Sequence, residues 1–215
     1  VTPRAGYRSA GDLKRDMTIT SLYCGIVDIH GYSEFCQRVG NNVSMLQHLD
    51  EVIQVDVATI AADEGVLSTR SRGDEIVLIG ARAVALLRTV MKIAELFSKS
   101  RSLDAGSSVR VASGGPLLLP AMAISAGIAG GQKYTPLVIT GDGDISGHLI
   151  NSAARLQSRA NKLSPTRTKV LLTTQVMSAT TREVSEGGAT LEVGEDGLNG
   201  GVFFWPSGQI RFKGI

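Results

Sequence analysis

The sequence predicts a mixed α/β fold of the α+β type, with strands and helices in the order β-α-β-β-α-β. Short runs rich in β-forming residues end at Gly or Asp turns. Two long segments between them carry apolar residues at helical spacing. A Gly-Asp dipeptide also separates two neighbouring β-rich runs, which is typical of a hairpin. This βαββαβ order is that of a ferredoxin-like core.

The expected elements begin after a polar, basic N-terminal arm at 1–17, and we expect a single domain over 18–215. They are a strand over 18–29, a helix over 42–64 that Gly65 ends, a hairpin of 66–72 and 75–79, a helix around 86–97, strands at 121–129 and 136–140, a helix over 145–160 and a strand over 169–173. Two loops are expected at 100–115 and 187–201, and a closing hairpin at 201–215.

Composition narrows the function classes. The 215 residues are 43% hydrophobic, which suits one sizeable core. The net charge of +2, the mixed signs of charge and the 5% aromatic content argue against a basic stripe that binds nucleic acid and against a helix that binds a membrane surface. Cys24 and Cys36 define neither a disulfide framework nor a zinc site, and Cys24 is expected to be buried in its apolar run. With no apolar stretch of membrane-spanning length and no signal-peptide core, we expect a cytoplasmic protein.

Two carboxylates form the first candidate site. Asp28 ends an apolar strand just before Gly31 and the start of a helix, and Asp74 lies in the hairpin turn. If the two strands are neighbours, both carboxylates meet at one end of the sheet. They repel each other unless cations join them, and two Mg²⁺ or Mn²⁺ ions fit that role. The alternatives are that Asp28 caps a helix and that Asp74 is an ordinary turn residue.

A second candidate lies on the helix expected at 145–160. Asn151 and Arg155 are four residues apart and share one helix face, roughly opposite an apolar face. That apolar face consists of Leu149, Ala153, Leu156 and Ala160. The alternative is a simply solvated pair. An EF-hand starting at Asp142 is excluded, because its twelfth position is Ala153 rather than Glu. The sequence contains no P-loop, and the three histidines lack metal-ligand spacing.

Together, these segments resemble the catalytic domain of class III adenylyl and guanylyl cyclases over about 22–215. Residues 27–33 are similar to the family's ADIxGFT segment. Residues 70–74, which an apolar strand follows, are similar to its KTIGD segment. Residues 147–156 are similar to GxxVNxAARL, and residues 212–214 to LKG. Each motif alone is weak, whereas four in the right order and spacing are specific. The resemblance implies a nucleotidyl cyclase that converts a nucleoside triphosphate to a 3′,5′-cyclic mononucleotide and pyrophosphate.

The resemblance also implies a role for each matching residue. Asp28 and Asp74 match the aspartates that bind two metal ions, and Ile29 adds its carbonyl. Asn151 matches the residue that orients the ribose, Arg155 the one that stabilises the pentavalent phosphate, and Lys213 the one that holds the β- and γ-phosphates. Arg70 and Asp144 match the base-selecting positions, and Tyr32 takes the place of the family's Phe. In a homodimer of this kind the metal aspartates come from one subunit and the other groups from its partner, which gives two sites at the interface.

The base-selecting positions depart from the adenylyl pattern, because Arg70 replaces Lys while Asp144 is kept. Arg is a longer, donor-only side chain, and uracil offers the O2 and O4 acceptors beside an N3–H that Asp144 can accept. Tyr32 adds bulk that favours a pyrimidine. We therefore predict UTP as substrate, with ATP as the runner-up and CTP still open.

The chain is also similar to the pyrimidine cyclases of bacterial anti-phage (Pycsar) systems, which implies cUMP as a second messenger. The alternatives are a catalytically inactive cyclase-homology domain for dimerisation or sensing, and a diguanylate-cyclase relative. Retention of Asp28, Asp74, Asn151, Arg155 and Lys213 argues against an inactive domain.

Overall fold

A five-stranded sheet organises the computed structural model, which describes residues 8–9, 22–40, 43–102, 118–131, 138–139, 145–163 and 166–187. The strand order is β10-β7-β2-β4-β3, and only the β10–β7 pair is parallel. The strands are β2 (Tyr23–Ile29), β3 (Ser68–Arg72), β4 (Glu75–Gly80), β7 (Ile124–Gly130) and β10 (Lys169–Leu172). The order β7-β2-β4-β3 is that of a ferredoxin-like core, so the predicted fold class is confirmed.

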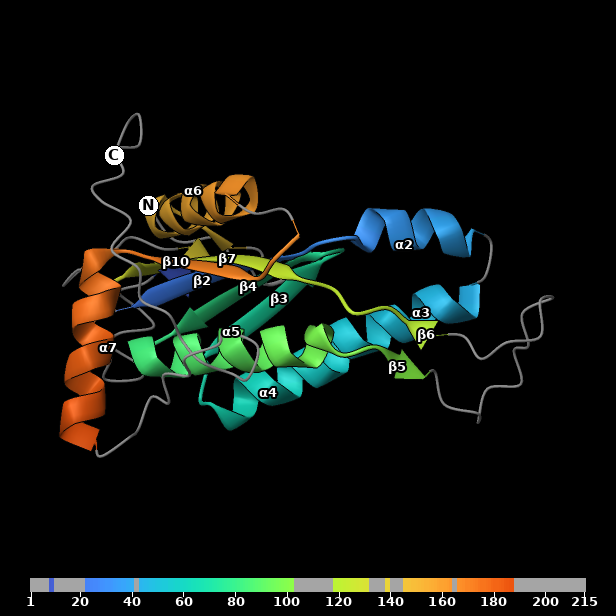
Figure 1. Ribbon diagram of the computed structural model, residues 1–215. Helices are drawn as coiled ribbons and strands as arrows, with labels where there is room; N and C mark the ends of the chain where they lie inside the picture. Colours follow the sequence, from blue (N-terminus) through green and yellow to red (C-terminus); the bar gives the residue numbers. More distant parts are fainter. Residues whose placement is uncertain are drawn as a thin grey trace.

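Helices cover both faces of this sheet (Figure 1). Helix α6 lies over one face, α4 and α5 lie over the other, α2 lies beyond the end of β2, and α7 lies at the opposite end of the sheet. The helices are α2 (Tyr32–Val39), α3 (Val43–Glu51), the π-helix η1 (Val52–Asp56), α4 (Val57–Asp63), α5 (Ala83–Ser98), α6 (His148–Leu163) and α7 (Thr174–Gly187). No helix in the described ranges is long and apolar enough to cross a membrane.

Two small sheets accompany the main one. Strand β8 (Val138–Ile139) pairs with β1 (Arg8–Ser9) and with β9 (Ile145–Ser146), while β5 (Arg101–Ser102) pairs with β6 (Leu118–Leu119). The first of these sheets joins a piece of the N-terminal arm to the segment that leads into α6.

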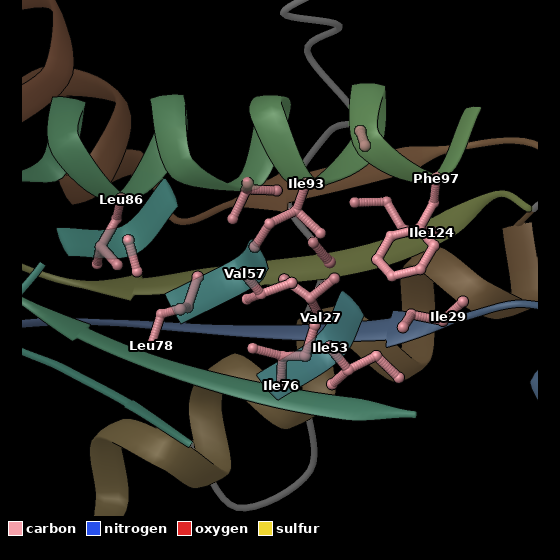
Figure 2. Close-up of a cluster of buried hydrophobic side chains, with 14 of the residues drawn as sticks. Val27, Ile29, Ile53, Val57, Ile76, Leu78, Leu86, Ile93, Phe97 and Ile124 are labelled. Atoms are coloured by element: carbon pink, nitrogen blue, oxygen red, sulfur yellow. The ribbon is translucent and has the colours of Figure 1, made fainter. Parts of the chain in front are cut away.

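The core has two layers because side chains alternate along each strand. Val27 and Ile29 of β2 belong to the larger layer, beneath α5, η1 and α4. Figure 2 shows this layer, in which Val27 lies near Ile76 of β4 and Ile53 of η1, and Ile29 lies farther along, at the end of β2. Cys24 and Ile26 face the other way, into the layer beneath α6. Cys24 is buried as expected, and alternation places Asp28 on the α6 side of the sheet.

Several boundaries differ from the sequence predictions. The helix expected from residue 145 begins at His148, because residues 145–146 pair with β8 as a strand. The loop expected at 100–115 begins with strand β5. The helix expected over 42–64 contains a π-helical turn, η1, between α3 and α4. The rest of the loop expected at 187–201 and the hairpin at 201–215 lie outside the described residues.

Helix α7 was not predicted from the sequence. Its buried residues include Val176 and Ala179, but much of the remainder is Thr, Ser and Glu, which gives only a weak apolar stripe. Its packing against α5 decides its conformation, since α5 and α7 are in contact. Gly187, expected to open a loop, is instead the last residue of this helix.

We expect Glu183→Ala to lower the free energy of unfolding by about 1–2 kcal/mol, which is typical of a lost helix cap. The Glu183 carboxylate of α7 accepts hydrogen bonds from the Ala83 and Val84 backbone N–H groups, both at 3.1 Å, and α5 has no side-chain cap of its own. Thermal unfolding monitored by circular dichroism measures the loss, at about 2–4 °C per kcal/mol. Glu186→Ala, at an exposed position of the same helix, is the control. Equal melting temperatures for the two variants would show that the cap contributes no stability.

Candidate functional site

The two candidate carboxylates lie at the same end of adjacent strands. In the β2–β4 ladder Asp28 is opposite Glu75, and the Ile29 N–H donates a hydrogen bond of 3.1 Å to the Asp74 carbonyl. Gly73 adopts a φ of 61° in the hairpin turn, a left-handed conformation that suits glycine. The turn therefore sets Asp74 beside the end of β2, as the sequence predicted if β2 and the hairpin were neighbours.

The electrostatics of this end of the sheet favour a bound cation. Burial raises the pKa of the Asp28 carboxyl above its ordinary value, the nearby charges of Asp74 and Glu75 raise it further, and His30 opposes them. Ionising Asp28 therefore costs free energy in the protein without metal. A divalent cation between Asp28 and Asp74 would offset that cost.

The donor set suits Mg²⁺ or Mn²⁺ better than a structural metal. The described ranges contain no group of three or more His, Cys, Asp or Glu side chains that could hold a metal ion. Mg²⁺ is commonly held by one or two carboxylates together with substrate phosphates and water. Asp28 and Asp74 thus fit a metal that binds together with a phosphate-bearing substrate.

The start of α2 lies next to these carboxylates. Gly31, at the N-cap of α2, has a φ of 82°, and no side chain caps the helix. Within the described part of the chain, a Cβ at Gly31 would meet nothing within 4 Å, so these residues leave the approach to the turn open. The first-turn N–H groups of α2 thus offer donors for phosphate oxygens beside the carboxylates.

Tyr32 begins α2 and is partly buried against the larger core layer. Burial raises the pKa of its phenol most. The negative charge of the Cys36 sulfur when ionised, the side-chain hydrogen bond between Tyr32 and Cys36, and the charges of Asp74 and Asp50 raise this pKa further. The Tyr32 ring therefore packs toward the α5 side, and its hydroxyl lies within electrostatic reach of Asp74.

Arg70 lies on the α6 side of the sheet, in the edge strand β3. It is opposite Val77 in the β3–β4 ladder, and Val77 is opposite Ile26 of β2. Residues paired across strands share a face, so Arg70 and Asp28 lie on the same face of the sheet. Helix α6 packs on β2, β7 and β10, and Arg70 and Val77 are partly exposed on the same face.

Asn151 and Arg155 do not meet the carboxylates within this chain. Both are exposed on α6, while Leu149, Ala153, Leu156 and Ala160 are buried, as predicted. Gln157, in the second half of α6, contacts Ser125, which is opposite Asp28 in the β2–β7 ladder. The first half of α6, with Asn151, therefore points away from the carboxylate end. The two side chains lie on the solvent-exposed side of α6.

This protein is similar in structure to solved cyclase domains. It matches the monomeric guanylyl cyclase domain of the RhoGC fusion protein from the aquatic fungus Blastocladiella emersonii with a TM-score of 0.52 and 14% identity, covering 85% of this chain and 90% of that one. The adenylyl cyclase CyaB from P. aeruginosa matches with a TM-score of 0.52 and 16% identity, covering 82% and 83% of the two chains. The chain has the adenylyl/guanylyl cyclase catalytic-domain fold. The adenylate/guanylate cyclase/hydrolase from Silicibacter pomeroyi also matches, with a TM-score of 0.50 and 19% identity over 84% and 85% of the chains. No protein-family model and no curated protein matches the sequence.

Within this cyclase fold, the structure brings together some of the candidate residues. Asp28, the Ile29 backbone, Asp74 and Tyr32 gather at the carboxylate end, and Arg70 shares the face of Asp28. Asp144 and Lys213 lie outside the described residues.

Three neighbours of the site had no role assigned from sequence. The His30 ring nitrogens are buried without a hydrogen-bond partner in the described part of the chain. Ser125 is fully buried and is hydrogen-bonded to Gln157. A polar residue within the apolar stripe of α6 was the available signal for Gln157, whereas nothing in the sequence marks Ser125.

Proposed function

We propose that the protein is a nucleotidyl cyclase that converts a nucleoside triphosphate to a 3′,5′-cyclic mononucleotide and pyrophosphate. The observation that supports this proposal is the arrangement of Asp28 and Asp74 in a cyclase fold, paired at one end of the sheet. Such a pair holds cations beside the uncapped start of α2, where phosphates bind. The exposed Asn151 and Arg155 supply the remaining groups.

In this proposal each side chain binds or orients part of the substrate. Asp28, Asp74 and the Ile29 carbonyl would hold two Mg²⁺ or Mn²⁺ ions, which supply charge neutralisation and activation of the 3′-hydroxyl when bound. Asn151 orients the ribose so that O3′ is in line with the departing pyrophosphate. Arg155 donates hydrogen bonds to the α-phosphoryl oxygens as their charge grows, and Lys213 holds the β- and γ-phosphates. An O3′–P bond forms, the bond to pyrophosphate breaks, and the hydroxyl proton leaves to solvent.

A homodimer completes the proposed site. Asn151 and Arg155 are exposed on the outer face of α6, and Gln157 and Ser125 link the second half of that helix to the carboxylate end. A two-fold partner that presents its own α6 to Asp28 and Asp74 would make two equivalent sites.

For the base we propose UTP, giving cUMP, with ATP as the second candidate. The support is Arg70, a donor-only side chain on the face of the sheet that carries Asp28. Arg70 matches the position at which the adenylyl cyclase pattern has Lys. Uracil presents two carbonyl acceptors to such a side chain. By its resemblance to the Pycsar enzymes, the product would serve as an anti-phage second messenger.

A panel of substrates tests the proposal directly. The protein is incubated with UTP, CTP, ATP or GTP and Mn²⁺, and mass spectrometry identifies the products. We expect a 3′,5′-cyclic mononucleotide and pyrophosphate, with UTP as the best substrate. A cyclic dinucleotide would indicate a diguanylate-cyclase activity, and no product from any triphosphate would contradict the enzyme assignment.

We expect Arg70→Lys to reduce kcat/KM for UTP by roughly 5- to 150-fold, the range for about 1–3 kcal/mol from a lost hydrogen bond in a desolvated pocket. Lysine is shorter and cannot present a planar fork of donors, whereas it can still serve adenine N1. ATP turnover should therefore fall less than UTP turnover. The measurement is kcat/KM for UTP, CTP and ATP with both proteins.

Arg82→Lys, at an exposed position beyond the end of β4 that lies opposite the carboxylates, is a matched control that should leave the UTP/ATP ratio unchanged. A wild-type preference for ATP would make the protein an adenylyl cyclase. An unchanged UTP/ATP ratio in the Arg70 variant would remove Arg70 as the base reader.

A further inference from the structure

The contact between α6 and the sheet consists largely of small and apolar groups. Ala153 and Leu156 of α6 pack against the side of β7 that carries Gly127. A Cβ added at Gly127 would lie 2.2 Å from the Ala153 carbonyl oxygen and 2.4 Å from the Gln157 backbone nitrogen. The helix backbone therefore rests directly on β7, on the face of the sheet shown beneath α6 in Figure 1.

A buried polar contact crosses this interface. The Ser125 side chain is 0% exposed, and its Oγ accepts a hydrogen bond of 2.8 Å from Gln157 Nε2. Ser125 is the register partner of Asp28 in the β2–β7 ladder, and Gly127 is the partner of Ile26. The bond therefore connects α6 to the strand position beside a proposed metal-binding carboxylate.

A hydrogen bond constrains α6 more sharply than apolar packing does. Apolar burial is non-directional, so the apolar groups of this interface specify the rotation of α6 less precisely than a hydrogen bond does. A hydrogen bond requires defined distances and angles, and a single buried polar contact can fix the register of packed helices. Together with the close packing over Gly127, the Gln157–Ser125 bond thus favours one rotation and axial position of α6 on β7.

Rotation of α6 matters because its outer face carries Asn151 and Arg155. Arg155 is about 200° around the helix from Gln157. A rotation of about 10° would move an atom about 8 Å from the helix axis by about 1.4 Å. Displacements of about 1 Å at a reacting centre can cost about 100-fold in rate.

We propose that Gln157 and Ser125 are positioning residues that hold α6 in the orientation in which Arg155 and Asn151 reach the substrate. This inference rests on the proposed cyclase function and adds two residues that touch neither substrate nor metal. They act through the helix. In the proposed dimer, α6 contributes Asn151 and Arg155 to the partner's site, whereas Ser125 lies beside Asp28 in the site of its own chain. The Gln157–Ser125 bond therefore links the two sites of the dimer.

Two variants test the proposal. Gln157→Leu keeps most of the side-chain volume but leaves the Ser125 hydroxyl buried without its partner, so both the melting temperature and kcat should fall. Combining Gln157→Leu with Ser125→Ala removes both polar partners, which restores much of the stability. We expect kcat to remain about 10- to 100-fold below wild type in the double variant, with KM within about threefold, because Arg155 acts mainly in the transition state.

The outcome of the double variant separates positioning from simple stabilisation. If kcat returns to the wild-type value together with the melting temperature, the bond only stabilises the fold and the proposal is overturned. Gln54→Leu, at an exposed position of η1, is the matched control and should leave kcat unchanged. If the wild-type protein is active and kcat is unchanged in both variants, the positioning role alone is overturned. A wild type that makes no cyclic nucleotide overturns the proposed function and this inference with it.

Discussion

Replacing Asp74 by alanine should reduce cyclisation by at least about 100-fold, the scale of loss when a main electrostatic contact to the transition state is removed. The reason is that Asp74 lies beside the end of β2 and shares its charge environment with Asp28, so its loss removes one of the two proposed metal-binding carboxylates. Asp28→Ala should behave in the same way. The measurements are product formation with Mn²⁺ and Mn²⁺ binding by calorimetry.

The fold of these variants should survive. Asp74 lies in a hairpin turn, and its structural bond to β2 is made by the backbone carbonyl, which alanine keeps. Removing the carboxylate also relieves the repulsion that raises the pKa of Asp28, so the melting temperature without metal should not fall. Asp63→Ala, at an exposed position of α4, is the control and should retain full activity. Folded Asp74→Ala protein with more than a few per cent of wild-type activity would contradict the assignment of Asp28 and Asp74 as metal ligands.

Mixing two inactive variants should restore activity if the site is shared between subunits. We combine Asp74→Ala protein with Arg155→Ala protein and allow the subunits to exchange. Each mixed dimer then has one site with both Asp74 and Arg155 intact and one site that lacks both. With random pairing, half of the dimers are mixed and each has one working site, so about a quarter of the wild-type activity should return.

A second mixture provides the control for complementation. Asp74→Ala protein combined with Asp28→Ala protein should stay inactive, because both residues belong to the same half of a site. Subunit exchange is checked independently by native mass spectrometry. If exchange is complete and the Asp74/Arg155 mixture remains inactive, the site is not assembled from two chains in the proposed way.

The fold class was predictable because its signals are local. Period-two alternation, helical periodicity and the Gly73 turn reflect side-chain burial and backbone sterics over a few residues. These signals predicted the sheet strands, the long helices and their order. Helix α7 escaped prediction because its apolar stripe is weak and its contact with α5 depends on residues far away in the chain.

The sequence by itself determined the fold class, the placement of Asp28 at a strand end and of Asp74 in a hairpin turn, and the shared helix face of Asn151 and Arg155. Local patterns are sufficient for these placements: a hairpin turn, a strand end and an i, i+4 spacing on a helix. Only the tertiary structure decided that Arg70 shares the face of Asp28 and that Gln157 is hydrogen-bonded to Ser125. It also decided that Asn151 lies in the half of α6 that is farther from Asp28. These relations depend on strand register and on the seating of α6 over Gly127. Both arise from packing between segments distant in sequence, for which no local pattern exists.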